Sequence, residues 1–249
     1  AHGDIEMSLV EAGINMLVEK PVALDLELAR DIQAGIEEKG IIATAGFQDR
    51  YIDVIDAMQN ILGASRPGIF MGYWMGGMPG VAWWRVKEQS GGQHVEQTIH
   101  TFDTARYLFG EVAVVHAVSS TGLMAEVPNY DVEDASAVNL EFESGLCGTI
   151  FSACFLSVGE QNGMEIWCKD VKIDYVERTS AQFTQANGDS EFITVKNDPR
   201  LDLDSTFIEA VEANDQSLLK SSYGDAVATL EVVLAAGESM QTGEAVDIG

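Results

Sequence analysis

The chain has 249 residues, of which 46% are apolar, so it can bury one large core or two modest ones. Its 40 acidic residues against 14 Lys and Arg give a formal net charge of -26, which disfavours nucleic acid and anionic membranes because such a field repels phosphate. No apolar run reaches the roughly 18 residues of a membrane-spanning helix, and the 3 cysteines, without CxxC spacing, predict buried free thiols in a reducing cytoplasm.

The first part of the chain alternates between helical and strand patterns. The expected elements are a helix over 4–12, a strand over 15–19, a helix over 25–39 and a strand over 41–45. This rhythm is typical of a doubly wound α/β sheet. The sequence nevertheless contains no GxGxxG turn, the motif that places a dinucleotide pyrophosphate at a helix N-terminus.

After a third helix, the pattern changes to consecutive strands. Glu143–Ser144–Gly145 predicts a hairpin turn, and Asn187–Gly188 predicts another tight turn. The expected strands are 68–73, 112–119, 134–142, 146–155, 164–168, 171–175 and 191–195, with helices over 50–62, 205–212 and 225–241. Consecutive hairpins predict a mostly antiparallel sheet, distinct from the parallel first part.

The stretch from Gly91–Gly92 to Gly110 carries the candidate chemistry. It predicts a glycine turn followed by one continuous helix, on which Glu96, His100 and Asp103 share a face. A histidine held by carboxylates suits a general acid/base at neutral pH. The same spacing also suits an exposed helix with polar pairs, and the residues alone leave both interpretations open. His94 falls on the other side of the helix, so no metal site is predicted.

Several motifs occur here in a characteristic order. They are Glu19–Lys20–Pro21 closing a strand, Trp84–Arg85, the glycine pair with Glu96, His100 and Asp103, and Ser221–Ala226 near the end. This set resembles the glucose–fructose oxidoreductase / inositol dehydrogenase (Gfo/Idh/MocA) family over nearly the whole chain. In that family an EKP motif ends a strand of the nucleotide-binding domain, and the histidine motif heads a helix of the second domain.

The resemblance implies a fold and a domain division. Residues 1–46 would belong to a Rossmann-like dinucleotide-binding domain. Residues 47–249 would form a larger substrate-binding and oligomerisation domain, an open and mostly antiparallel sheet with helices on one face. The exposed face or edges of such a sheet need a cover, so the resemblance implies a homodimer or homotetramer formed through the sheet.

It also implies a reaction, the transfer of hydride between NAD or NADP and a sugar, inositol or related polyol. His100 would be the base, and Lys20 would stabilise the alkoxide and favour neutral His100. Asp103 would orient the imidazole, and Glu96 would bind a substrate hydroxyl or hold Lys20. The residues expected near the cofactor are Glu19, Lys20, Pro21, Trp84 and Arg85. Aromatic faces and a guanidinium also suit a sugar site lined by Trp83, Trp84 and Arg85, although the two tryptophans equally suit the core and Arg85 suits a solvated charge.

Two features depart from the family pattern. Glu96 stands where these dehydrogenases commonly have Asp, and the glycine fingerprint that precedes the EKP strand in the family is absent. We therefore expect a fragment of a longer enzyme that binds NAD(P) weakly or not at all and is inactive by itself. Two alternatives stay open, namely an NAD-dependent glycosidase of the same family and a non-enzymatic module that dimerises or binds a ligand.

Overall fold

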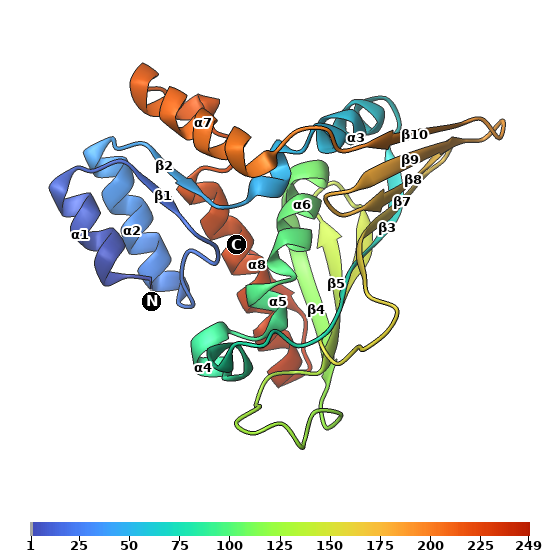
Figure 1. Cartoon of the computed structure of the whole chain (residues 1–249), viewed down its shortest axis with the longest axis horizontal. Coiled ribbons are helices and arrows are strands. Elements are labelled where there is room, and N and C mark those ends of the chain that lie inside the picture. Colours follow the sequence, from blue (N-terminus) through green and yellow to red (C-terminus); the bar gives the residue numbers. More distant parts are fainter. Residues whose placement is uncertain (1) are drawn as a thin grey trace.

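Two β-sheets of different size organise the chain (Figure 1). The computed structural model describes residues 2–249. The small sheet pairs β1 (Met16–Val18) with β2 (Ala43–Ala45) in parallel, and helices α1 (Asp4–Ala12) and α2 (Leu26–Lys39) precede and connect its strands. This arrangement confirms the parallel α/β part that the sequence predicted.

Local sequence signals fix the ends of these helices. Gly13 and Gly40 end α1 and α2 with left-handed φ values of 67° and 63°, which glycine adopts without a steric penalty. The carboxylate of Asp25 caps the start of α2 by accepting a hydrogen bond from the backbone N–H of Leu28. Beyond β2, the amide of Ala45 donates to Ser221 O, so the C-terminal part of the chain is bonded to the small sheet.

The large sheet has nine strands in the order β10-β9-β8-β7-β3-β6-β5-β4-β11. Only the central β3–β6 pair is parallel, which confirms the predicted, mostly antiparallel sheet. Its strands are β3 (Pro67–Met75), β4 (Val112–Ser120), β5 (Ala135–Phe142), β6 (Cys147–Ala153), β7 (Gln161–Cys168), β8 (Val171–Val176), β9 (Ser180–Gln185), β10 (Ser190–Thr194) and β11 (Val246–Asp247). The sequence reading missed β9 and the two-residue β11 at the edge.

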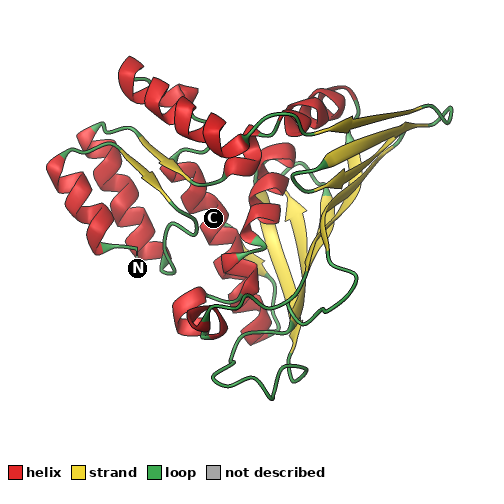
Figure 2. Ribbon diagram, in the orientation of Figure 1, coloured by secondary structure: helices red, strands yellow, loops and turns green. Residues whose placement is uncertain are grey.

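Helices cover one face of this sheet and leave the other face bare (Figure 2). The helices and turns of this part are η1 (Gln48–Tyr51), α3 (Asp53–Ala64), η2 (Ala82–Arg85), α4 (Lys87–Ser90), α5 (Gln93–Glu96), α6 (Ile99–Phe109), α7 (Pro199–Ala213), η3 (Gln216–Leu218) and α8 (Tyr223–Thr242). The covered face supplies Phe70, Ile150 and Ile166, all fully buried in the main core. The helix-covered open sheet agrees with the architecture implied by the family resemblance.

Two predicted helices are each interrupted. The helix expected over 50–62 is the 3₁₀ turn η1 followed by α3, and the helix expected after Gly92 is divided into α5 and α6. Thr98 lies at the second interruption, where its buried hydroxyl accepts a hydrogen bond from Ser152 on β6. The helix is thus tied to the sheet at the point where it changes direction.

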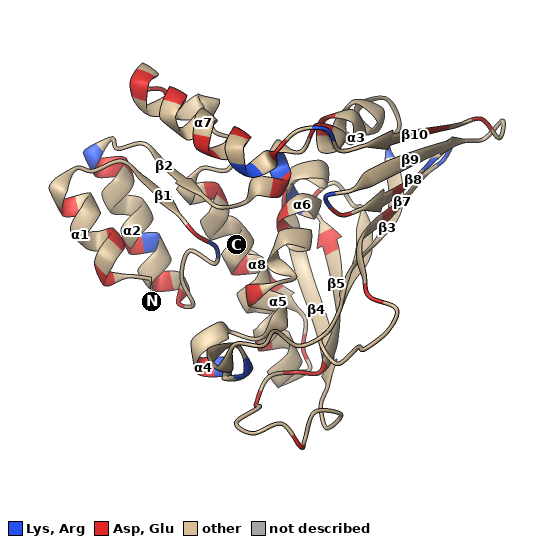
Figure 3. Cartoon of the chain, viewed as in Figure 1, with Lys and Arg blue, Asp and Glu red and all other residues tan. Residues whose placement is uncertain are grey.

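The surface agrees with the composition. Acidic side chains are spread over helices, strands and loops rather than gathered in one tail (Figure 3). Cys147, Cys154 and Cys168 are unbridged, although Cys147 is exposed rather than buried as expected. Within residues 2–249, no helix has both the length and the apolar character required to cross a membrane.

Candidate active site

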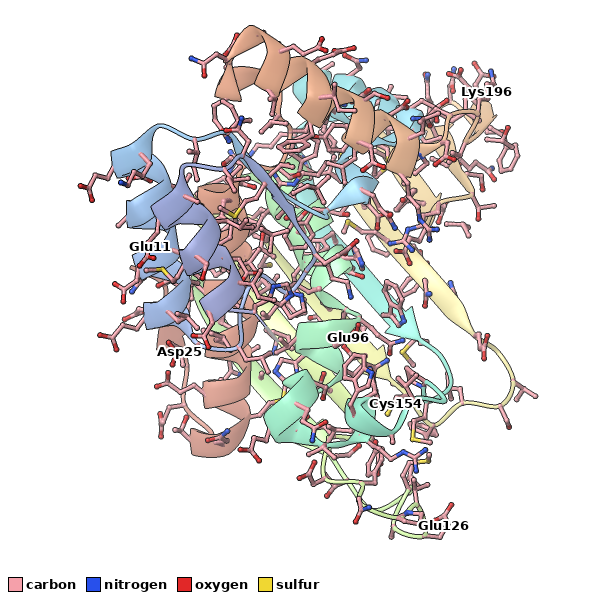
Figure 4. The ribbon with its side chains drawn as sticks, turned by 60° about the vertical axis from the view of Figure 1, so that its left-hand side comes forward. Glu11, Asp25, Glu96, Glu126, Cys154 and Lys196 are labelled. Carbon is pink, nitrogen blue, oxygen red and sulfur yellow. The ribbon has the colours of Figure 1, made fainter. Side chains whose placement is uncertain are left out.

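Lys20 lies where the small sheet meets the large domain. It follows β1, and its Nζ donates to both the backbone carbonyl and the side-chain Oε1 of Glu96, the latter at 2.9 Å. Figure 4 shows Glu96 on α5, whose start at Gly92 has a φ of 93° that favours glycine. A side chain at Gly92 would also clash, since its Cβ would lie 2.8 Å from Glu133 Oε2. The glycine pair therefore brings Glu96 to Lys20.

Trp84 holds the other oxygen of the same carboxylate. Its indole Nε1 donates to Oε2 of Glu96 at 2.9 Å, so Glu96 bridges Lys20 and Trp84. The tryptophan is fully buried, which leaves it no surface for contact with a cofactor or sugar. The predicted lining role of Trp84 is therefore corrected to that of a support for Glu96.

A cleft of about 650 Å³ opens beside this network. Pro21, Leu24 and the half-exposed ring of Trp83 give it apolar walls, while Lys20 and Glu96 supply charged groups. This size and mixture are typical of small-molecule sites. Since Asp25 and Glu88 also line it, the cleft suits an uncharged ring or polyol better than a pyrophosphate.

His100 is only 6% exposed and lies in a cage of aromatic and charged groups. Its ring stacks on Trp74 with a centroid distance of 5.9 Å and meets the edge of Phe47 at 6.1 Å. Burial, opposed by the charge of Asp49 and assisted by the charges of Lys20 and Arg178, lowers the pKa of His100 to about 3. The imidazole is therefore neutral at physiological pH and has a free lone pair to accept a proton.

The carboxylate next to His100 is Asp49, which the sequence analysis did not single out. Its Oδ2 lies 3.7 Å from Nδ1 of His100. Arg178, in the β8–β9 turn, binds the same carboxylate through Nε and Nη2 at 2.6 and 3.0 Å. The hydrogen bonds and charge of Arg178 lower the pKa of Asp49 although its burial acts to raise it. A stable negative charge thus lies beside the neutral imidazole.

Asp103 has a different position from the one predicted. Both of its oxygens accept hydrogen bonds from Arg50, at 2.7 and 2.8 Å, and Thr229 of α8 donates to Oδ1 at 2.9 Å. Burial raises the pKa of Asp103 while Arg50 acts to lower it. His100 and Asp103 both lie on α6, but Arg50 and Thr229 occupy the oxygens of Asp103, so this carboxylate joins α6 to η1 and α8 instead of orienting His100.

The remaining predicted residues occupy several environments. Pro21 lines the cleft, and exposed Glu19 packs over Gly46, where a Cβ would lie 2.8 Å from its Oε2. Arg85 is half-buried in η2 and, unlike Trp83 of the same turn, does not line the cleft. His94 is buried against α8 and lies 4.0 Å from Glu133, separate from the group around His100 as predicted.

Comparison with known proteins gives two matches to models of one family. Residues 1–47 match the model described as "Oxidoreductase family, NAD-binding Rossmann fold", and residues 68–174 match the "GFO/IDH/MocA C-terminal domain". The two matched segments lie on either side of the cleft, since the first contains Lys20 and the second contains Glu96.

Similar curated proteins include two inositol dehydrogenases. The NAD(+)-dependent scyllo-inositol 2-dehydrogenase of Bacillus subtilis is 31% identical over 157 residues, which are 60% of this chain and 44% of that protein. The myo-inositol 2-dehydrogenase of Thermotoga maritima is 26% identical over 239 residues, 90% of this chain and 70% of that protein. The chain therefore spans less than half the length of the first of these relatives.

Solved structures share the fold at low sequence identity. A levoglucosan dehydrogenase in complex with NADH and L-sorbose has a TM-score of 0.86 and 20% identity, covering 100% of this chain and 77% of that one. An NAD-binding oxidoreductase of Klebsiella pneumoniae has a TM-score of 0.87 and 17% identity, with coverage of 100% and 77%. The arrangement of both sheets is thus that of known oxidoreductase structures.

Proposed function

The chain belongs to the Gfo/Idh/MocA family of oxidoreductases, and on that premise we propose that it serves hydride transfer between NAD and a sugar, inositol or related polyol. Residues 1–46 are proposed to contribute to the dinucleotide-binding domain and residues 47–249 to bind substrate. The observation that carries the proposal is the Lys20–Glu96 pair at the cleft, with the neutral imidazole of His100 close to it.

The hydrogen bonds of Lys20 prepare it for a substrate oxygen. An ammonium has three N–H donors, and two of them are used by the backbone and side chain of Glu96. The third remains for the oxygen of a reacting hydroxyl, where the positive charge would stabilise a developing alkoxide. Glu96 fixes the direction of this donor and is itself held by Trp84. Lys20 is therefore proposed as the electrostatic catalyst.

His100 is proposed to take the hydroxyl proton. Its burial and the nearby ammonium keep it neutral, which is the state that a base requires before it acts. When bound, the nicotinamide supplies the hydride acceptor. The apolar wall formed by Pro21, Leu24 and Trp83 suits the ring of that cofactor, and the polar groups of Lys20 and Glu96 suit a polyol.

Two other functions make different experimental predictions. An NAD-dependent glycosidase of this family would release an aglycone without net NADH formation, whereas a dehydrogenase would accumulate NADH. A non-enzymatic module would bind ligand or self-associate without turnover. Lys20 and Glu96 line the cleft, and His100 lies close enough to feel the charge of Lys20. This combination favours a catalyst, because a module would not need an ammonium and a buried neutral base together.

We also propose that the bare face of the large sheet joins two copies of the chain. Ile69, Met71 and Phe151 project from neighbouring strands β3 and β6 and are 49%, 37% and 37% exposed. Contiguous apolar surface of this kind is typical of an interface. Light scattering of the native protein and of Met71→Lys tests this interface. We expect a dimer for the native protein and a shift towards monomer for the variant, and a monomeric native protein would contradict the interface.

The experiment that tests the main proposal is cofactor binding followed by turnover. Calorimetric titration with NAD and NADP is carried out on these 249 residues and on the complete product of the gene that encodes them. We expect weak or absent binding by the 249 residues, which contain no GxGxxG turn, and micromolar binding by a product that supplies one. Polyols are then screened for NADH formation. Absence of both binding and turnover in the complete product would contradict the proposal and favour the module.

A further inference from the structure

A small cavity lined by His100 lies between α6 and strands β7 and β8. Its volume is about 10 Å³, close to the space that one water molecule requires. The polar side chains around it belong to His100, Thr101, Thr104, Tyr175 and Glu177. A site of this size with several polar neighbours suits a single bridging water.

Two polar atoms at this cavity lack partners. Nδ1 of His100 and Oε1 of Glu177 are both buried without a hydrogen bond to any residue in 2–249. Unpaired buried polar atoms are costly, and two of them beside one water-sized space indicate that a shared water satisfies both. His100 and Glu177 are therefore neighbours across a single hydrogen-bonding site.

Asp49 is less suited than Glu177 to exchange a proton with His100. It lies 3.7 Å from Nδ1, but both of its oxygens bind Arg178 at 2.6 and 3.0 Å. Oε1 of Glu177 lies 3.4 Å from Nη2 of Arg178 without a hydrogen bond, and the side chain keeps 10% of its surface exposed. Glu177 thus has a route to solvent and an oxygen free of hydrogen bonds, while both oxygens of Asp49 bind Arg178.

From this geometry we propose that Glu177 is a positioning residue that relays protons between His100 and solvent through one water in the cavity. The relay rests on the proposed function. In the oxidation direction, the O–H bond of the substrate breaks and its proton goes to Nε2 of His100. The proton on Nδ1 passes to the water, and that water gives a proton to the Glu177 carboxylate. The imidazole is then neutral with its proton on Nε2, and Glu177 loses its proton to solvent. Tautomer exchange returns the proton to Nδ1 before the next turnover.

The charged surroundings favour this direction of transfer. The groups that face the pair are Lys20 after β1, Asp49 in η1, Tyr175 on β8 and Arg178 in the turn. Burial, reinforced by the charge of Asp49, raises the pKa of Glu177 to about 8, whereas burial lowers the pKa of His100 to about 3. A proton on His100 therefore moves readily to ionised Glu177, and the relay operates fully only above about pH 8.

The test replaces Glu177 by Gln, which has nearly the same shape but cannot take up a proton. The matched control is Glu191→Gln, which removes an exposed acid on β10. In the complete enzyme we expect kcat at pH 8.5 to fall about 100-fold in Glu177→Gln, at the lower end for a positioned acid–base group. The rise in kcat centred near pH 8 should disappear as well, and the control should change neither.

A nitrogen-detected NMR spectrum of the 249-residue chain provides a readout independent of turnover. Glu177→Gln should change the Nδ1 shift or the tautomer of His100, because the partner of the bridging water changes. Unchanged His100 shifts, or an active enzyme whose pH profile survives the substitution, would overturn the relay alone. A native enzyme without any turnover would instead overturn the proposed function, so the two failures are distinguishable.

Discussion

His94 and His100 are both buried, and each lies near a carboxylate that is paired with a cation. His94 lies 4.0 Å from Glu133, which binds Lys87, and His100 lies 3.7 Å from Asp49, which binds Arg178. Burial lowers the pKa of His94 to about 4 and that of His100 to about 3. The two groups of a histidine, a carboxylate and a cation are therefore nearly the same in residue types and in the direction of the histidine pKa shift.

Their surroundings separate them. His94 is packed against α8 so tightly that a Cβ at Gly237 would lie 3.2 Å from its Nε2. His100 has a water-sized cavity on one side and feels the charge of Lys20, which lines the cleft. A buried histidine with a lowered pKa is thus not by itself a functional site. The nearby charge of Lys20 and an unpaired nitrogen are the features that assign chemistry to His100 rather than to His94.

The largest expected effect comes from replacing each histidine by Gln in the complete enzyme. His100→Gln should reduce kcat by about 10²- to 10⁴-fold, the contribution of a general base, while its melting temperature changes little. His94→Gln should retain about the native kcat. Its free energy of unfolding should fall by about 1 kcal/mol because the packing is disturbed. Equal losses of kcat in both variants would contradict the assignment of catalysis to His100 rather than to His94.

A second expected effect concerns Asp103, the acid of the histidine motif that binds Arg50. Asp103→Asn breaks a buried ion pair with Arg50, which should cost about 3 kcal/mol of unfolding free energy. The cost lies at the low end of the range because Arg50 also binds Asp225. The control is Asp56→Asn, which breaks an exposed ion pair with Lys220 and should leave the free energy of unfolding almost unchanged. Urea unfolding measures both, and an unchanged Asp103→Asn midpoint would contradict the structural role.

The sequence was sufficient for much of the architecture. Gly13 and Gly40 marked helix ends correctly, because a left-handed residue there is a local requirement that glycine meets. The hairpin at Glu143–Ser144–Gly145 was also local and is confirmed. Strand β9 was missed because its residues Ser180–Gln185 are mostly small and polar, and their strand conformation depends on pairing with β8 and β10.

The candidate site was only partly accessible to sequence reasoning. The pairing of Lys20 with Glu96 is one of the two roles predicted for Glu96, whereas the partner of His100 was not predicted. The helical count assumed one continuous helix, and the interruption before α6 separates Glu96 from His100 and Asp103. The role of Asp103 was mispredicted for another reason, because Arg50 from η1 binds both of its oxygens. Asp49, Glu177 and Arg178 reach His100 from η1 and the β8–β9 turn, so only the tertiary structure brings them together.

The smallest expected effect is in the pH dependence of stability. Because the folded-state pKa values of His94 and His100 lie below the ordinary value of 6.5, the unfolded chain takes up protons first as the pH falls through that value. Acidification from pH 6.5 to 5 should therefore lower the free energy of unfolding by about 2 kcal/mol for each histidine. Replacing either one by Gln should remove its share of this pH dependence, as measured by urea unfolding at both pH values.

Glu177→Gln should change the pH dependence of stability in the opposite direction. The raised pKa of Glu177 stabilises the fold at low pH, and this contribution is lost between about pH 4.5 and 8. If the Glu177 and histidine variants changed the pH dependence in the same direction, the assignment of neutral His100 beside a protonated Glu177 would be wrong.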